Sequence, residues 1–298
     1  MASYAIDRLI EKIRGTGNPS VIGLDPRTEH IPPALFKYQG EAEAILEFNR
    51  AIIDAVADIA PAVKPQIAMY ERLGAAGLAA YARTIEYARA AGLIVVGDIK
   101  RGDVAATAAA YAAAHIADGA PFAADFVTVN PYMGFDAVSP FLAAAESNGR
   151  GVFALVKTSN PRSGDIQDIT TATGEPLYER VGRLVSEWGA DRLGEFGYSS
   201  VGAVVGATYP EQGKALRGIM PRAFILVPGY GAQGAAAADL RGFFNADGMG
   251  AIVNSSRGIT AAWLSPKYRE LRDDFAAAAR RAAMDMRDDL RAVCGPRS

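Results

Sequence analysis

Short apolar runs alternate with amphipathic segments along most of the chain. The amphipathic segments carry apolar residues at helical spacing, which predicts helices at about residues 41–59, 73–91, 103 onward, 137–147 and 177–193. The apolar runs are typical of buried parallel strands and fall at residues 20–24, 62–65, 93–98, 125–130, 151–157, 201–206, 224–228 and 250–254. Such alternation predicts right-handed parallel crossovers, and eight strands favour a closed barrel over an open sheet. We therefore expect an α/β fold, a single (β/α)8 TIM-barrel domain over residues 1–298.

Two further helices flank the repeating part, and one long polar segment interrupts it. Residues 4–14 are amphipathic and precede a Gly-rich stop, which predicts a helix that caps the barrel. The Ala-rich stretch 268–293 predicts a C-terminal helix along the outside of the barrel. Residues 158–175 are polar and break the alternation. Loops of this length often belong to active sites, although a disordered insertion has the same appearance in sequence.

Polar residues stand where the predicted strands end. In a barrel the carboxyl ends of the strands converge on one open face, which is where the active sites of such folds lie. Solvated surface charges would instead scatter over helix faces and both ends of the barrel. The strand-end residues are Asp25, Lys64, Asp98 with Lys100, Asn130, Lys157 with Ser159, Gln233 and Arg257. This placement predicts a charged site at the carboxyl face.

The third of these strand ends carries the densest set of charges. Asp98 and Lys100 are two residues apart on a strand, so their side chains point to the same face and can meet. Asp103 suits the positive end of the helix that follows, and Thr107 lies one turn further along. In isolation this D-x-K-x-x-D pattern also fits a surface turn with solvated ion pairs. Its place at a strand end favours a catalytic role.

Two loops late in the chain have the composition of a phosphate site. Residues 228–234 follow the seventh predicted strand and are rich in glycine, which lets backbone N–H groups approach an anion closely. Residues 254–259 follow the eighth strand and contain Arg257, whose guanidinium can hold a phosphate through two hydrogen bonds. Loops seven and eight are the usual phosphate site of this barrel. We expect an anionic substrate to be held here.

Composition and charge exclude several other functions. The net charge of −2 offers no basic surface for nucleic acid or an anionic membrane. We find neither a signal peptide nor an apolar stretch of about 18 residues, so we expect a cytoplasmic protein. The single cysteine, Cys294, cannot form an internal disulfide. The two histidines, His30 and His115, make a poor zinc site, so no metal is expected.

Six short motifs extend from the first predicted strand to the eighth. They are Gly23-Leu24-Asp25, Val63-Lys64-Pro65, the run from Asp98 to Asp103 with Thr107, Ser159-Asn160-Pro161, Val227-Pro228-Gly229 and Ser256-Arg257-Gly258. Together they resemble the orotidine 5′-phosphate decarboxylases, in particular their longer bacterial form. The resemblance implies conversion of orotidine 5′-monophosphate to UMP and CO2, the last step of de novo pyrimidine synthesis. It also implies that no metal or organic cofactor takes part.

The resemblance further implies roles for individual residues. The catalytic set consists of Lys64, Asp98, Lys100 and Asp103, and Asp103 and Thr107 reach into the site of a neighbouring subunit. Activity would therefore require a homodimer. The substrate-binding set comprises Asp25 and Lys64 at the ribose hydroxyls, Ser159 at the pyrimidine, Pro228 in the loop after strand seven, and Gln233 and Arg257 at the phosphate. No role transfers to Asn130.

The chemistry of the reaction agrees with this array. Loss of CO2 leaves a poorly delocalised carbanion at C6 of the pyrimidine, so the barrier must fall through charge placement in a dry pocket. Lys100 is placed to stabilise that carbanion and then protonate it. Asp98 and Asp103 would keep Lys64 and Lys100 cationic, because opposite unit charges about 4 Å apart attract by roughly 4 kcal/mol at an effective dielectric near 20.

Three other functions fit parts of the pattern. Sugar-phosphate decarboxylases and hexulose-phosphate synthases have a similar D-x-K-x-x-D barrel but look metal-dependent, with an acidic residue where this chain has Lys64. A Schiff-base aldolase could use Lys157, since a desolvated barrel lysine can act as a nucleophile. Outside enzymes, Arg101-Gly102-Asp103 is the adhesion tripeptide, although no secretion signal accompanies it.

Overall fold

The eight predicted strands form a closed parallel barrel in chain order. The structure is a computed structural model and describes residues 4–37, 40–231 and 236–294. Each strand pairs in parallel with its neighbours in sequence, and β1 closes the barrel on β8. The strands are β1 (Ser20–Leu24), β2 (Ala62–Pro65), β3 (Ile94–Arg101), β4 (Phe126–Val129), β5 (Gly151–Lys157), β6 (Ser199–Val205), β7 (Ala223–Pro228) and β8 (Ala251–Ser255). The predicted (β/α)8 fold is confirmed.

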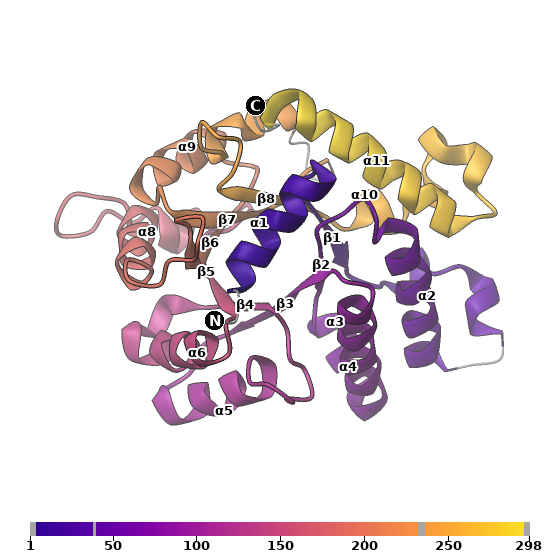
Figure 1. The fold of residues 1–298 in the computed structure, drawn as a ribbon, viewed down its shortest axis with the longest axis horizontal. Coiled ribbons are helices and arrows are strands. Elements are labelled where there is room, and N and C mark those ends of the chain that lie inside the picture. The colour runs from indigo at the N-terminus through magenta and orange to yellow at the C-terminus, as the bar shows by residue number, and fades with distance from the viewer. Residues whose placement is uncertain (1–3, 38–39, 232–235, 295–298) are drawn as a thin grey trace.

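Helices surround the barrel on the outside, and the first of them lies across its end (Figure 1). Within the described residues they are α1 (Ala5–Thr16), α2 (Glu41–Val56), α3 (Ala68–Glu71), α4 (Gly74–Ala90), α5 (Ala105–His115), α6 (Phe135–Ser147), α7 (Gly164–Gln167), α8 (Leu177–Trp188), α9 (Pro210–Ile219), α10 (Arg257–Thr260) and α11 (Phe275–Cys294). Six short 3-10 helices, η1 to η6, occur in the loops; those used below are η1 (Thr28–His30), η3 (Pro131–Met133), η4 (Ala237–Phe243) and η6 (Pro266–Leu271). None of these helices combines the length and apolar character of a membrane span.

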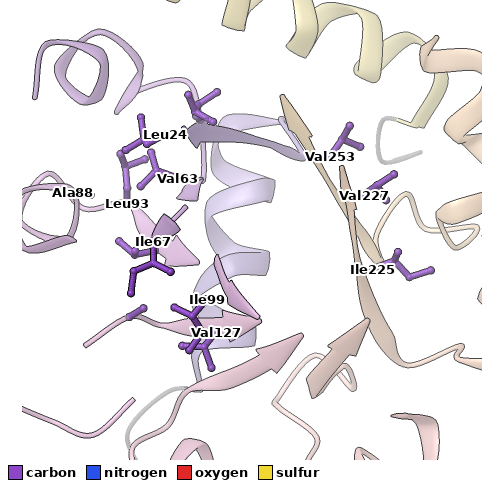
Figure 2. Packing of buried hydrophobic residues seen from close by; sticks show 14 of the residues in the cluster. Leu24, Val63, Ile67, Ala88, Leu93, Ile99, Val127, Ile225, Val227 and Val253 are labelled. Atoms are coloured by element: carbon purple, nitrogen blue, oxygen red, sulfur yellow. The ribbon is translucent and has the colours of Figure 1, made fainter. Parts of the chain in front are cut away.

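Strand alternation divides the apolar residues into two layers. Outward residues such as Val63, Val95 and Val253 pack with the surrounding helices in the larger cluster, part of which is shown in Figure 2. Inward residues of the same strands form a second cluster inside the barrel. Its strand members include Val21, Ala62, Ile94, Val96, Phe126, Phe153, Phe224 and Ile252. Successive strand residues face opposite sides, so one apolar run supplies both layers.

Helix α1 closes the amino end of the barrel. Its apolar face consists of Ile6, Leu9, Ile10 and Ile13, each no more than 1% exposed, and these belong to the inner cluster. Gly17 ends the helix in the left-handed conformation, with φ of 57°. The predicted capping role of the N-terminal helix is therefore confirmed.

The C-terminal helix lies on the outside of the barrel, as predicted, but begins later than expected. Residues 266–271 form η6, in which Tyr268 has non-helical backbone angles, and the regular helix α11 starts at Phe275. Helix α11 packs between α2 and η4 and so closes the outer ring (Figure 1). The segment 158–175 contains the short helix α7 and a bridge between Thr170 and Pro176, so it is an ordered loop.

Candidate active site

A cavity of about 420 Å³ opens at the carboxyl end of the barrel. It is lined by charged residues from β1 to β3 on one side and by the loops after β7 and β8 on the other. The charged members are Asp25, Arg27, Lys64, Asp98, Lys100 and Arg257. Strand ends that are far apart in sequence thus meet at this face, as the sequence predicted.

The inward charges follow from the same alternation that builds the inner core. On β2, Ala62 lies in the apolar inner cluster, and Lys64 stands two residues further along the same face. On β3, Val96 is in that cluster and Asp98 follows it in the same way. Each strand therefore places an apolar residue at mid-height and a polar residue at the mouth. The apolar cluster inside the barrel therefore lies directly beneath the charged residues.

Lys64 and Asp98 form a buried ion pair at the centre of the site. Lys64 Nζ lies 2.7 Å from Asp98 Oδ2 and 3.7 Å from Asp25 Oδ1, and Lys64 and Asp98 are 4% and 5% exposed. Burial by itself would lower the pKa of Lys64, but the two carboxylates outweigh it and hold that pKa above its ordinary value. Burial likewise opposes ionisation of Asp98, but Lys64 and Lys100 hold the pKa of its carboxyl well below the usual range. Both groups are charged at neutral pH.

Lys100 completes the charged array from a strained position. Its Nζ donates to Asp98 Oδ1 at 2.5 Å, and its side chain is 43% exposed toward the cavity mouth. Its backbone has φ of 47°, the one positive φ among the non-glycine residues that the structure describes. The pairing of β3 with β4 shifts register between Gly97 and Arg101, which accommodates this conformation. Strain of this kind is characteristic of functional sites.

Two residues that the sequence analysis overlooked complete the hydrogen bonding of Asp98. Thr128 on β4 donates its hydroxyl to Asp98 Oδ1 at 2.9 Å, and Gln66 after β2 donates to Asp98 Oδ2 at 3.0 Å. Gln66 lies two residues beyond Lys64, and Thr128 lies two beyond Phe126 of the inner cluster. Counting every second residue from an inward-facing strand position would have identified both residues from the sequence.

Asp103 and Thr107 stand apart from the array. Asp103 Oδ1 accepts a hydrogen bond from Val104 N at 2.8 Å, and α5 begins only at Ala105, so Asp103 precedes the helix rather than opening it. Thr107 is exposed on the first turn of α5. Exposed apolar side chains occur just before α5, on η3 and at the start of α6; we call Val104, Tyr132, Met133 and Phe135 the apolar patch.

The two predicted phosphate loops line the opposite side of the cavity. Pro228 ends β7, and Gly229 and Tyr230 follow it; Ser256 follows β8, and Arg257 begins α10. Gly229 has φ of 104°, a backbone angle that suits glycine. Gln233, the other predicted phosphate ligand, lies outside the described residues.

Lys157 and Ser159 at the end of β5 occupy a different environment. Lys157 is fully buried, pairs with Asp168 at 2.6 Å and lies 4.7 Å from the centre of the Tyr209 ring. This pair anchors the loop after β5. Ser159 contacts Thr208, whose hydroxyl donates to the Ser159 carbonyl at 3.5 Å, and it does not line the cavity that the described residues form. Asn130 caps η3 by accepting from Tyr132 N.

The histidines divide between the rim of the site and the core. His30 follows β1 and lines the same cavity; burial lowers its pKa, and Arg27 and Arg257 act in the same direction. His115 at the end of α5 is 4% exposed and stacks on Phe122. Burial, assisted by a nearby cation, lowers the pKa of His115 to about 4, so it is neutral at pH 7.

Within the described residues, neither a metal site nor the cavity at the amino end of the barrel matches this array. No group of three His, Cys, Asp or Glu side chains in the described residues could hold a metal ion. A larger cavity of about 820 Å³ lies beside α1 at the amino end of the barrel. Arg150 in its lining pairs with Asp118, and Arg8 pairs with Asp125, so these cations hold the chain together. The chemistry of the carboxyl face has no counterpart there.

Comparisons of sequence and of structure match this chain to one group of known proteins. Residues 19–268 match the model of the orotidine 5′-phosphate decarboxylase / HUMPS family. The chain is 46% identical over 292 residues to the orotidine 5′-phosphate decarboxylase of Petrotoga mobilis, covering 97% of this chain and 99% of that one. It is 43% identical to the Clostridium novyi enzyme of the same name, over 96% and 98% of the two chains. The solved structure of Leishmania donovani OMP decarboxylase superposes with a TM-score of 0.78 at 32% identity, over 97% of this chain and 98% of that one.

Proposed function

Because this chain belongs to the orotidine 5′-phosphate decarboxylase / HUMPS family, we propose that it converts orotidine 5′-monophosphate to UMP and CO2 in pyrimidine biosynthesis. The observation that carries the proposal is the charged array Asp25–Lys64–Asp98–Lys100 at the carboxyl end of the barrel. The array faces a cavity whose far side is built from the two candidate phosphate loops. A nucleotide phosphate and a pyrimidine ring therefore have separate places to bind.

Lys64 favours decarboxylation without a metal over the metal-dependent branch of similar barrels. Its ammonium lies between Asp25 and Asp98, and both carboxylates are therefore already neutralised by a protein cation. A divalent ion at this point would have to displace the Lys64 ammonium or sit beside it. The Schiff-base alternative loses support because Lys157 is fully buried against Asp168 and Tyr209.

Substrate orientation follows from the two sides of the cavity. Arg257 and the backbone around Gly229 hold the 5′-phosphate, together with Gln233. Asp25 and Lys64 hold the ribose hydroxyls. The pyrimidine then lies with C6 toward Lys100, and Ser159 contacts the ring after the loop that follows β5 has adjusted.

The reaction needs one bond cleavage and one proton transfer. The bond between C6 and the carboxylate carbon breaks, CO2 leaves, and the electron pair stays at C6. Lys100 Nζ stabilises this pair by its charge and then donates a proton to C6, giving UMP. Asp98 holds Lys100 Nζ at 2.5 Å and so fixes the donor before the substrate arrives. Solvent later restores the proton on Lys100.

The active form is a homodimer with shared sites. Asp103 accepts a hydrogen bond from Val104 N and forms no ion pair with Lys64 or Lys100 of its own subunit, Thr107 is exposed, and Val104 of the apolar patch adjoins Asp103 in sequence. Contiguous exposed apolar side chains mark protein interfaces. A twofold contact through this patch would carry Asp103 of each subunit toward the Lys64 and Lys100 pair of the other. Asp103 then becomes the second acid of the array.

An assay of orotidine 5′-monophosphate loss in the presence of EDTA tests the function. We expect turnover that chelation does not reduce. Lys100→Ala should abolish turnover while UMP binds within about tenfold of wild type, because the phosphate and ribose contacts remain. Lys214→Ala is the matched control, since Lys214 is exposed on α9. Turnover retained by Lys100→Ala would exclude Lys100 as the proton donor.

Mixing two inactive variants tests the shared site. A dimer of one Lys100→Ala subunit and one Asp103→Ala subunit contains one intact site if Asp103 acts across the interface. Random mixing should then restore about a quarter of wild-type turnover. If Asp103 acts within its own subunit, the mixture stays as inactive as either variant alone.

A further inference from the structure

Thr128 links the backbone and the side chains of the catalytic array. It lies on β4, is 1% exposed, and faces the barrel interior beside β3. Its hydroxyl accepts a hydrogen bond from Lys100 N at 2.9 Å and donates one to Asp98 Oδ1 at 2.9 Å. One hydroxyl therefore joins the main chain of Lys100 to the carboxylate that holds the Lys100 ammonium.

The break in strand pairing explains why a hydroxyl is needed at this place. The β3–β4 ladder pairs Gly97 with Val127 and resumes only at Arg101 with Val129. Lys100 lies in the gap with φ of 47°, a conformation that non-glycine residues rarely adopt. Its N–H lacks the carbonyl partner that a regular ladder would supply, and the Thr128 oxygen takes that place. The hydroxyl thus holds the strained turn.

The donors around Asp98 show what the second bond of Thr128 achieves. Oδ1 receives the Lys100 ammonium and the Thr128 hydroxyl, while Oδ2 receives the Lys64 ammonium and the Gln66 amide. Two donors on each oxygen fix the carboxylate plane. A hydroxyl has one proton, so donation to Asp98 leaves its oxygen free to accept from Lys100 N. Both hydrogen bonds can form together in one arrangement of the hydroxyl.

We propose that Thr128 is a positioning residue for decarboxylation, setting the backbone and the ammonium of Lys100 relative to C6. This role rests on the proposed function, in which Lys100 donates the proton. Thr128 touches Lys100 and Asp98 rather than the substrate. Its loss should therefore slow the chemical step and leave nucleotide binding nearly unchanged, because small displacements of a reacting group cost large factors in rate.

Thr128→Val and Thr128→Ser separate the hydroxyl from the shape of the side chain. Valine keeps the branched shape and removes the hydroxyl, and we expect kcat to fall by about 10- to 100-fold with the dissociation constant of UMP within about threefold. Serine keeps the hydroxyl, and we expect kcat within about fivefold of wild type. Thr84→Val is the matched control, because Thr84 is a fully buried threonine on α4 whose hydroxyl donates to Ala80 O.

Steady-state kinetics, UMP titration and thermal unfolding of the four proteins decide the matter. Wild-type kcat in Thr128→Val would overturn the role. Equal losses in Thr128→Val, Thr128→Ser and Thr84→Val would also overturn it, since they would reflect general destabilisation. A parallel loss of UMP affinity would assign Thr128 to the shape of the binding site instead. An inactive wild type refutes the proposed function and this role together, whereas an active wild type with an unaffected valine variant refutes the role alone.

Discussion

The buried pair Lys64–Asp98 should respond unequally to removal of its two members. At 2.7 Å the charges attract by about 6 kcal/mol at an effective dielectric near 20. Desolvation of both groups offsets much of this attraction. In Asp98→Asn the Lys64 ammonium stays buried, with Asp25 at 3.7 Å as its remaining counter-ion. Because Asp25 compensates Lys64 only in part, we expect the unfolding free energy to fall by about 3–4 kcal/mol, the lower part of the range for a buried charge that loses its partner.

Lys64→Met should cost less, about 1–3 kcal/mol, because Asp98 keeps three of its four donors. The double variant removes both charges, so its cost should be smaller than the sum of the single costs by about 1–3 kcal/mol. Urea denaturation at pH 7.5 and fixed protein concentration measures all three values. Glu43→Gln is the control, because its pair with Arg83 is solvent-exposed and worth less than about 1 kcal/mol. Additive effects, or an Asp98→Asn cost near that of the control, would refute the reasoning.

Three further outcomes are expected. Folding holds the pKa of Lys64 above 10.5 and the pKa of Asp98 below 3.8. The stability that the Lys64 charge contributes is therefore lost only above pH 10.5, and the stability that the Asp98 charge contributes is lost only below pH 3.8. A pH profile of kcat should accordingly show no inflection from either group between about pH 5 and 9. His115 has a pKa of about 4 in the folded protein, below the value of 6.5 in the unfolded chain. The free energy of unfolding of wild type, measured in urea, should therefore fall by up to about 3 kcal/mol between pH 6.5 and pH 4. The His115→Phe variant should lose less over the same pH range. In Gly23→Ala the added Cβ would lie 2.8 Å from Ser256 Cβ and displace the loop after β8. The KM for orotidine 5′-monophosphate should therefore rise about tenfold or more. Circular dichroism should show that the fold persists.

Strand positions were predictable because the barrel needs them to be apolar on both faces. A strand buried on two sides reads as a continuous apolar run, and the polar residue that ends each run marks the carboxyl face. Asp25, Lys64, Asp98 and Lys100 were therefore found from placement alone, and the structure brings them together. Helix ends were less predictable, since packing and loop geometry set them. The helix expected from Asp103 begins at Ala105, for example.

The contacts of Lys100 could not be predicted from local patterns. The two-residue spacing predicts that Asp98 and Lys100 share a face because it assumes a regular strand. The pair does form, but the strand is irregular at Lys100. The positive φ at Lys100 arises from the interrupted pairing with β4, and that interruption depends on a partner 28 residues away, Thr128. Tertiary hydrogen bonds of this kind leave no periodic signal in sequence.

Helix α1 stabilises the fold that carries the charged array, although it lies at the opposite end of the barrel. Its four buried aliphatic residues each stabilise the fold by up to about 1.5–3 kcal/mol, which is the same order as the cost of keeping charges at the other end. The same residues belong to the apolar cluster inside the barrel, whereas Lys64 and Asp98 line the cavity at its carboxyl end. Substrate bound in that cavity would displace water from the array. In the proposed reaction, electrostatic stabilisation of the C6 carbanion would be strongest under that condition, because its strength grows as the surrounding dielectric falls.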